Sequence, residues 1–218
     1  MKEEDLLKEA QEIDKELKEG KIKIRDTKTP LIYVIIPFLI LLMILMIIPY
    51  YSIKLNPEPK NIPGLEIIPE NIELIDLGNI SYRRYNNYLT PNDPVIKQLA
   101  DKIVTQSCRE NKICYAKALY YFVRDNFNYV SDPLAFEYVK TPRESLIAKG
   151  GDCDDASVLL ANLERAIGIN TKFVFIPGHV YIQIYLPEAP KKYSKDGWIN
   201  LDATCKNCEF GEISYRNI

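Results

Sequence analysis

Residues 150–160 read GGDCDDASVLL, and this stretch decides where the main helix of the domain begins. A glycine pair precedes one cysteine among three aspartates, and an apolar helical pattern starts directly after them. The pattern predicts a helix that begins near Asp152 and Cys153 and ends at Gly168. Its buried stripe is expected to consist of Ala156, Leu159, Leu160, Leu163 and Ile167.

The position of Cys153 favours a reactive thiol over a structural one. At the positive end of a helix, free backbone N–H groups stabilise a thiolate relative to a thiol. The neighbouring aspartates oppose this effect, and for Asp155 helix capping is the preferred interpretation. A thiolate among carboxylates needs a cationic partner. The chain contains one histidine, so His179 is the only imidazole available.

The segments around this helix indicate an α+β domain. Upstream, residues 94–108, 115–127 and 141–150 have helical periodicity; Thr141 is expected to cap the last of these helices, and Gly150 to end it. Downstream, the periodicity changes to the alternation that is typical of strands. Helices followed by an antiparallel sheet form an α+β fold.

Three strands are predicted, over residues 171–177, 179–186 and 198–204. His179 opens the second of them, and Asp202 lies near the end of the third. If these two strands pair antiparallel, Asp202 comes to lie beside His179, because alternate residues of each strand share one face. The carboxylate would then hold the ring through one nitrogen while the other nitrogen faces the sulfur.

Three motifs in this order resemble the transglutaminase-like superfamily: GGDCDDASVLL, GHVYIQIYL and GWINLDAT. The lead-in YYFVRDNFNYVSDP, followed by TPRESLIAKGGDC, is also similar to that family, and the resemblance covers about Asp93 to Thr204. For this part of the chain it implies a papain-like core. It also implies that Cys153 is the nucleophile, His179 the base and then the acid, and Asp202 the carboxylate that orients the ring.

The resemblance implies attack of a Cys153 thiolate on an amide or ester carbonyl, giving a thioester that water or an amine then resolves. Hydrolysis of amide or peptide bonds is the leading expectation. The substrate is expected to be a protein, a peptide or a cell-envelope amide, and no cofactor or resident metal is expected. Two alternatives stay open, a protein cross-linking acyltransferase and a catalytically inactive binding module tethered to the membrane.

Two features of the expected site are less defined. The N–H of Cys153 is a candidate for one oxyanion donor, and Tyr129 or Tyr138 for the second. Many members of the family have Trp and Glu at the second and fourth positions after the histidine, where this chain has Tyr181 and Gln183. This departure leaves the three expected catalytic residues in place. It means that the substrate groove of the family is not carried over to this chain.

Four cysteines remain besides Cys153, at positions 108, 114, 205 and 208. Two local pairs, Cys108–Cys114 and Cys205–Cys208, would suit an oxidising compartment. The CKNC spacing also fits a zinc site, and free or redox-active thiols are the third alternative. The sequence leaves the choice open.

Residues 31–48, LIYVIIPFLILLMILMII, carry no charge and no polar stripe, and eighteen residues span ~27 Å as a helix. They predict a single transmembrane helix over 30–51, because no cleavage site for a signal peptide follows. Five Lys and Arg residues lie just before this segment and two lie just after it. The N-terminus is therefore expected in the cytoplasm and the C-terminal domain outside the cell membrane.

The remaining segments complete the expected organisation. Residues 1–29 are expected to form an amphipathic helical segment, and residues 52–92 a Pro-rich spacer that holds the domain of 93–218 off the bilayer. The formal net charge is −2, and no basic stripe is present. Nucleic acid is therefore excluded as an expected partner, whereas the lipid bilayer is one. The stripe of the N-terminal segment comprises Leu6, Ala10, Ile13 and Leu17.

Overall fold

The computed structural model describes residues 11, 14–15, 29–74, 85–133 and 138–214. The apolar stripe expected at Leu6, Ala10, Ile13 and Leu17 lies outside the described residues, as do the Lys and Arg residues that precede the apolar segment. The chain forms two compact units, Met1–Tyr50 and Tyr51–Ile218. Each unit is described by itself.

Most of one long helix, α2 (Thr29–Leu55), belongs to the first unit, which ends at Tyr50. Its apolar part, Leu31–Tyr51, is long and apolar enough to cross a membrane, and it is the one such helix among the described residues. The large side chains along this part are exposed, which is the arrangement expected of a helix that a bilayer surrounds. Membrane spans and signal sequences share this length and composition.

Four helices build one layer of the second unit: α3 (Pro94–Ser107), α4 (Lys112–Asn126), α5 (Pro142–Ala148) and α6 (Cys153–Ala166). Each begins where the sequence supplies a polar N-cap. The carboxylate of Asp93 accepts a hydrogen bond from Val95 N–H at the start of α3, and the amide oxygen of Asn111 accepts one from Ile113 N–H at the start of α4. Two short 3₁₀ helices precede this layer, η1 (Leu65–Ile67) and η2 (Tyr85–Tyr88).

The end of α5 differs from the expected one. Thr141 and Glu144 form the predicted capping box, but the helix is closed by Lys149, whose φ of 53° lies in the left-handed region. Gly150 was expected to end the helix and instead lies in strand β2 (Gly150–Gly151), parallel to β1 (Asn128–Tyr129). Glycine is needed at position 150 for this pairing, because a Cβ there would lie 2.6 Å from the carbonyl oxygen of Asn128 in β1.

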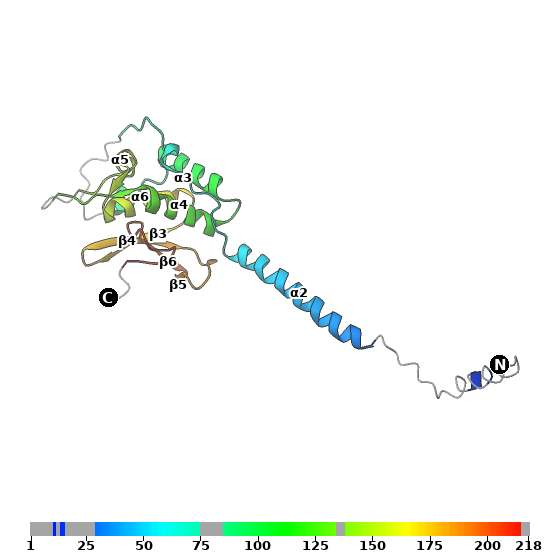
Figure 1. The fold of residues 1–218 in the computed structure, drawn as a ribbon. Helices are drawn as coiled ribbons and strands as arrows, with labels where there is room; N and C mark the ends of the chain where they lie inside the picture. Colours follow the sequence, from blue (N-terminus) through cyan, green and yellow to red (C-terminus); the bar gives the residue numbers. More distant parts are fainter. Residues whose placement is uncertain (1–10, 12–13, 16–28, 75–84, 134–137, 215–218) are drawn as a thin grey trace. The chain divides into compact units, whose positions relative to one another are not determined.

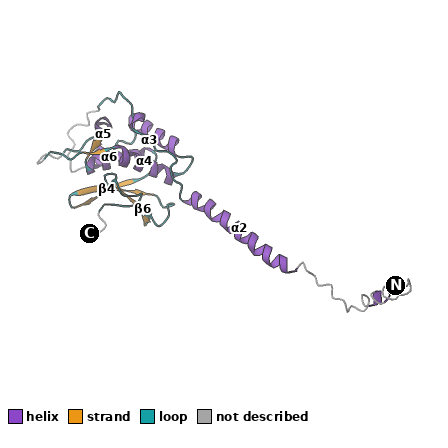
Figure 2. Ribbon diagram, in the orientation of Figure 1, coloured by secondary structure: helices purple, strands orange, loops and turns teal. Residues whose placement is uncertain are grey.

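The second layer is an antiparallel sheet of four strands in the order β3-β4-β6-β5. Figure 2 shows these strands in orange as a layer below the helices. The α+β fold predicted from the sequence is confirmed, and the three predicted strands are present. The strands are β3 (Thr171–Ile176), β4 (His179–Tyr185), β5 (Ser194–Lys195) and β6 (Trp198–Leu201).

The core lies between the two layers, where α6 packs against β4 with α3 and α4 beside it (Figure 1). The apolar stripe of α6 predicted from the sequence faces this core. Burial of these side chains provides the main stabilisation of the unit and fixes α6 over the sheet, so that the N-terminus of α6 has a defined place beside the start of β4. Fully buried residues of the core include Leu159, Leu160, Leu163, Ile182, Ile184 and Ile199.

The described residues between 56 and 74, which the sequence predicts to be a Pro-rich spacer, pack onto the domain. Ile68 is buried in the core, and Lys60 N–H donates to the carbonyl of Ser107. The fully buried Lys117 ammonium binds Asn56 and Glu58. The Pro-rich composition suggested an extended chain, but its isoleucines supply apolar surface that the domain buries.

Candidate active site

Cys153 is the first residue of α6 and follows the strand β2. Both glycines of β2 are required by their neighbours. A Cβ at Gly151 would lie 2.5 Å from the Cβ of Asp155, closer than side chains can approach, and Gly150 lies against β1. The glycine pair therefore allows the chain to pass between β1 and the first turn of α6, which positions the sulfur at the helix N-terminus.

His179 is positioned by the sheet. Pro177 and Gly178 form the turn between β3 and β4, and Gly178 has a φ of +71° that a residue with a side chain rarely adopts. β4 pairs antiparallel with β6, with Ile182 opposite Leu201. The next residue after β6 is Asp202, and its Oδ2 lies 3.0 Å from Nε2 of His179.

The carboxylate of Asp202 is buried and held from several sides. Thr204 Oγ1 donates to its Oδ1 at 2.9 Å, and Ser214 Oγ donates to its Oδ2 at 3.1 Å. Burial alone would raise the pKa of Asp202, but the hydrogen bond from His179, its charge and the bond from Thr204 outweigh burial and lower that pKa. Asp202 is therefore an anion at neutral pH and orients the imidazole ring.

Cys153 lines the same cleft as His179, and interaction with the Cys153 side chain is the second cause, after Asp202, that raises the pKa of the ring. Because Nε2 contacts Asp202, the nitrogen left for the sulfur is Nδ1. The hydrogen bonds with Asp202 and then with Cys153 raise the pKa of His179 to about 9, although burial opposes this shift. At neutral pH the ring is an imidazolium, which is the cationic partner that a thiolate among carboxylates needs.

The structure thus brings together the three residues singled out in the sequence. Cys153 and His179 line an open cleft of about 600 Å³, as does Phe175. Asp202 is not among the residues that line it and contacts His179. Of the two tyrosines considered as oxyanion donors, Tyr129 lines this cleft. Tyr138 donates its hydroxyl to Glu144 at 2.6 Å. An oxyanion role therefore remains a prediction for Tyr129 alone.

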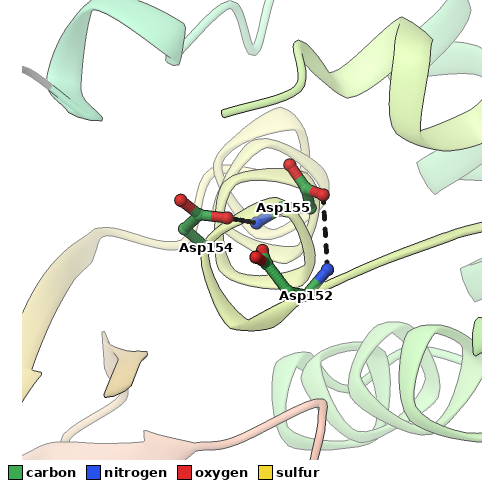
Figure 3. A group of neighbouring side chains, drawn as sticks. All are labelled: Asp152, Asp154 and Asp155. Carbon is green, nitrogen blue, oxygen red and sulfur yellow. Dashed lines mark hydrogen bonds between the residues drawn. The ribbon is translucent and has the colours of Figure 1, made fainter. Parts of the chain in front are cut away.

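The three aspartates around Cys153 lie at the N-terminus of α6, where the carboxylates of Asp154 and Asp155 accept hydrogen bonds from backbone N–H groups (Figure 3). Asp155 accepts hydrogen bonds from the N–H groups of Lys140, at 2.7 Å, and Asp152, at 3.3 Å, and it pairs with the Lys140 ammonium. The capping interpretation of Asp155 therefore fits its contacts. Lys140 was not found from the sequence, because only folding brings it to α6.

Asp154 is buried and behaves as a neutral acid. Burial, followed by its hydrogen bond with Asp152, raises the pKa of Asp154 to about 9. Its Oδ1 accepts from the N–H of Asp155 at 2.7 Å, and Tyr85 donates to its Oδ2 at 3.3 Å. The three carboxylates are close enough to share a cation. Asp155 already has the Lys140 ammonium as its counter-ion, and the contacts of Asp155 and Asp154 with backbone N–H groups are those of a capped helix.

The remaining cysteines form two disulfides, Cys108–Cys114 and Cys205–Cys208. Their Cα–Cα distances are 6.0 and 5.3 Å, within the range of ordinary disulfides. Oxidised sulfurs are not metal ligands, so the zinc alternative for CKNC is excluded by this pairing. Cys153 is the free cysteine of the chain.

Comparison with known proteins gives a match to one protein family. The family model described as the transglutaminase-like superfamily matches residues 97–203. Comparison with curated proteins finds no match.

Similar solved structures include a proposed cysteine protease from Cytophaga hutchinsonii, at 18% identity over 54% of this chain and 39% of that chain, with a TM-score of 0.39. The periplasmic domain of TgpA from Pseudomonas aeruginosa, bound to ethylmercury, is 17% identical over 59% of this chain and 51% of that one, with a TM-score of 0.35. The chain thus spans about two fifths to one half of the length of these proteins.

Proposed function

Because residues 97–203 form a domain of the transglutaminase-like superfamily, we propose that this chain is a membrane-anchored thiol enzyme that hydrolyses amide or peptide bonds through a thioester on Cys153. One observation carries the proposal. The His179 ring lies between the side chain of Cys153 and the carboxylate of Asp202, at the mouth of an open cleft. A free cysteine with a packing role alone requires neither a charged imidazole nor a carboxylate behind it.

In the first half of the reaction, the Cys153 thiolate attacks the carbonyl carbon of the substrate and forms a C–S bond. The N–H of Cys153, at the start of α6, supplies a donor to the developing oxyanion. The His179 imidazolium then gives its proton to the nitrogen of the leaving amine as the C–N bond breaks. The thioester and a neutral imidazole remain.

In the second half, His179 removes a proton from water as the water oxygen attacks the thioester carbonyl. The C–S bond breaks, the carboxylic acid leaves, and thiolate and imidazolium are restored. Asp202 keeps its charge throughout and orients the ring. If an amine takes the place of water, the same residues transfer the acyl group, so hydrolysis and cross-linking differ only in the acceptor.

The proposed location is the extracytoplasmic side of a membrane, with α2 as the anchor and the N-terminus in the cytoplasm. Two features support it. Disulfides persist in oxidising compartments, and the domain has two of them. Leu31–Tyr51 has the length and composition of a span. A protein, a peptide or a cell-envelope amide is the proposed substrate class, because such amides are accessible there.

The direct test uses an activated ester, p-nitrophenyl acetate, with the full chain in detergent micelles. We expect release of p-nitrophenol in a burst, an acetyl adduct on Cys153 by peptide mass spectrometry, and loss of both in the Cys153→Ala variant. A fluorescent alkylamine added to the same reaction distinguishes transfer from hydrolysis. A chain that binds the cleft's ligands without any acyl adduct would instead be the tethered binding module.

A further inference from the structure

β3 is an edge strand of the four-stranded sheet, so one of its sides has no neighbour among the strands of the described residues. A groove follows this side. One part of it, about 560 Å³, is lined by residues of η2 and β3 and by Arg165, and the other part is the cleft of Cys153. Tyr85 and Phe175 line both parts, so the groove continues along β3 to the sulfur.

The register determines which backbone groups of β3 face this groove. Tyr185 N–H donates to the carbonyl of Asn170 at 2.8 Å, so this opposed pair is a hydrogen-bonded one. In an antiparallel ladder hydrogen-bonded and non-hydrogen-bonded pairs alternate, so Lys172 and Val174 bond to β4. Thr171, Phe173 and Phe175 then direct N–H and C=O away from β4.

One contact supports this assignment. The guanidinium of Arg165 donates to the carbonyl of Thr171 at 2.7 Å, and it reaches that oxygen from outside the β3–β4 pair. Arg165 thereby closes one end of the exposed edge. Within the described part of the chain, the backbone groups of Phe173 and Phe175 have no partner beyond β3, and these two residues lie between Arg165 and the Cys153 cleft.

The side chains along the groove are aromatic. Phe175 is 58% exposed although it is large and apolar. The ring centroids of Tyr85 lie 5.5 Å from Phe173 and 5.0 Å from Phe175. Exposed edges of this composition are a hazard for proteins, which usually cover them or use them to bind. The chemistry at Cys153 gives no reason for this aromatic surface.

We propose that an extended peptide binds this groove as an added strand on β3, with main-chain hydrogen bonds to the exposed N–H and C=O groups of Phe173 and Phe175. The inference rests on the proposed function, in which this peptide is the substrate, and it assigns the substrate class as extended polypeptide. Alternate side chains of the peptide pack on the Tyr85 and Phe175 rings, which favours apolar or aromatic residues there. The added strand continues toward the turn before His179 and so brings one of its carbonyls to Cys153.

The first experiment compares alkylating reagents on the full chain in detergent micelles. The probe is acetyl-Ala-Phe-Ala-Phe-Gly chloromethyl ketone, and iodoacetamide is the small reference reagent. We expect the ratio of the two labelling rates at Cys153 to rise as the peptide is lengthened from one residue to five. N-methylation of single peptide amides should lower the ratio about 10-fold at alternate positions, since each removes one main-chain hydrogen bond, and much less at the positions between.

The second experiment changes the protein. Proline at an edge strand removes one N–H and leaves a ladder intact when that N–H faces outward. Phe173→Pro is therefore compared with Phe173→Ala, which loses the same ring but keeps the N–H. We expect the peptide-to-iodoacetamide ratio to fall about 10-fold from the Ala to the Pro variant. If the Pro variant does not fold, the N-methyl series on the wild-type chain still decides.

A third measurement separates this inference from the proposed function. A fluorescein-labelled peptide amide of the same sequence is titrated against the Cys153→Ala variant, which cannot react. Binding with the alternating N-methyl pattern supports the added strand even if Cys153 proves unreactive. The inference is overturned if the ratio of the peptide and iodoacetamide labelling rates does not change with peptide length, or if N-methylation has the same effect at every position. It is also overturned if the chain forms a dimer that Phe173→Pro dissociates while the labelling ratio stays the same, because a second copy of the chain would then occupy the edge of β3.

Discussion

Nε2 of His179 lies 3.0 Å from Oδ2 of Asp202, although 23 positions separate the two residues in the chain. The antiparallel pairing of β4 with β6 produces this contact, because His179 begins one strand and Asp202 follows the other. The contact favours the charged form of the ring and leaves Nδ1 for a second partner. The predictions below concern this arrangement and the glycines and disulfides that support it.

Asp202→Asn keeps the shape of the side chain and removes its charge. The imidazolium then loses its main stabilisation, so we expect the turnover of p-nitrophenyl acetate to fall by about 10²–10⁴-fold, the range typical of general acid–base catalysis. Thr204→Val is the matched control, because it removes one neutral donor to Asp202 and leaves the carboxylate. An Asn variant no slower than the Val variant would argue against an orienting role of Asp202.

The raised pKa of His179 predicts a pH dependence of stability. The pKa is about 9 in the folded protein and ~6.5 in an unfolded chain, so the folded state binds the proton more tightly. The stabilisation is complete below pH ~6.5 and is lost as the pH rises through about 9. The difference in the free energy of unfolding between wild type and His179→Gln should therefore shrink across this interval.

Urea unfolding of the full chain in detergent, followed by near-UV circular dichroism at several pH values, measures that difference. A gap between the two proteins that is constant from below pH ~6.5 to above pH ~9 would contradict the ion pair.

Gly151→Ala is expected to destabilise the domain by about 1–3 kcal/mol, the range of overpacked sites. The new methyl group would overlap the side chain of Asp155, which is fixed by Lys140. Gly64→Ala is the control, because its methyl group would meet the flexible end of Glu66, which can move away. Thermal unfolding of the two variants checks the expectation, and equal melting temperatures would count against a steric role of Gly151.

Removal of the Cys108–Cys114 disulfide by a double substitution to serine should cost about 2 kcal/mol, as the loop-closure relation gives for a short loop. The disulfide joins the end of α3 to the first turn of α4, far along the chain from Cys153. We expect the rate of Cys153 alkylation by iodoacetamide to remain close to that of the wild type. Denaturant unfolding measures the cost, and an unchanged unfolding midpoint would mean that the bond constrains nothing.

Much of the fold could be predicted because the local signals were long and mutually consistent. The stripe of α6, the alternation of β4 and the turn before His179 each extend over several residues, and together they indicated the pairing that brings Asp202 to the ring. The α+β fold is confirmed, whereas the catalytic roles of Cys153, His179 and Asp202 stay predictions.

Other features depend on tertiary contacts that a sequence pattern does not contain. β1, β2 and β5 have two residues each, too few to display a period. Lys140 and Tyr85 reach the aspartates beside Cys153 only after folding. Proline composition predicted an extended spacer, yet the apolar residues between the prolines made burial on the domain favourable.

The rate at which iodoacetamide alkylates Cys153 at neutral pH, in the full chain with His179 and with His179→Ala, tests the central claim most directly. The imidazolium is expected to activate the sulfur toward alkylation, so the wild type should react about 10²-fold faster, with peptide mass spectrometry placing the adduct on Cys153. Equal rates in the two proteins, with both folded, would contradict the account.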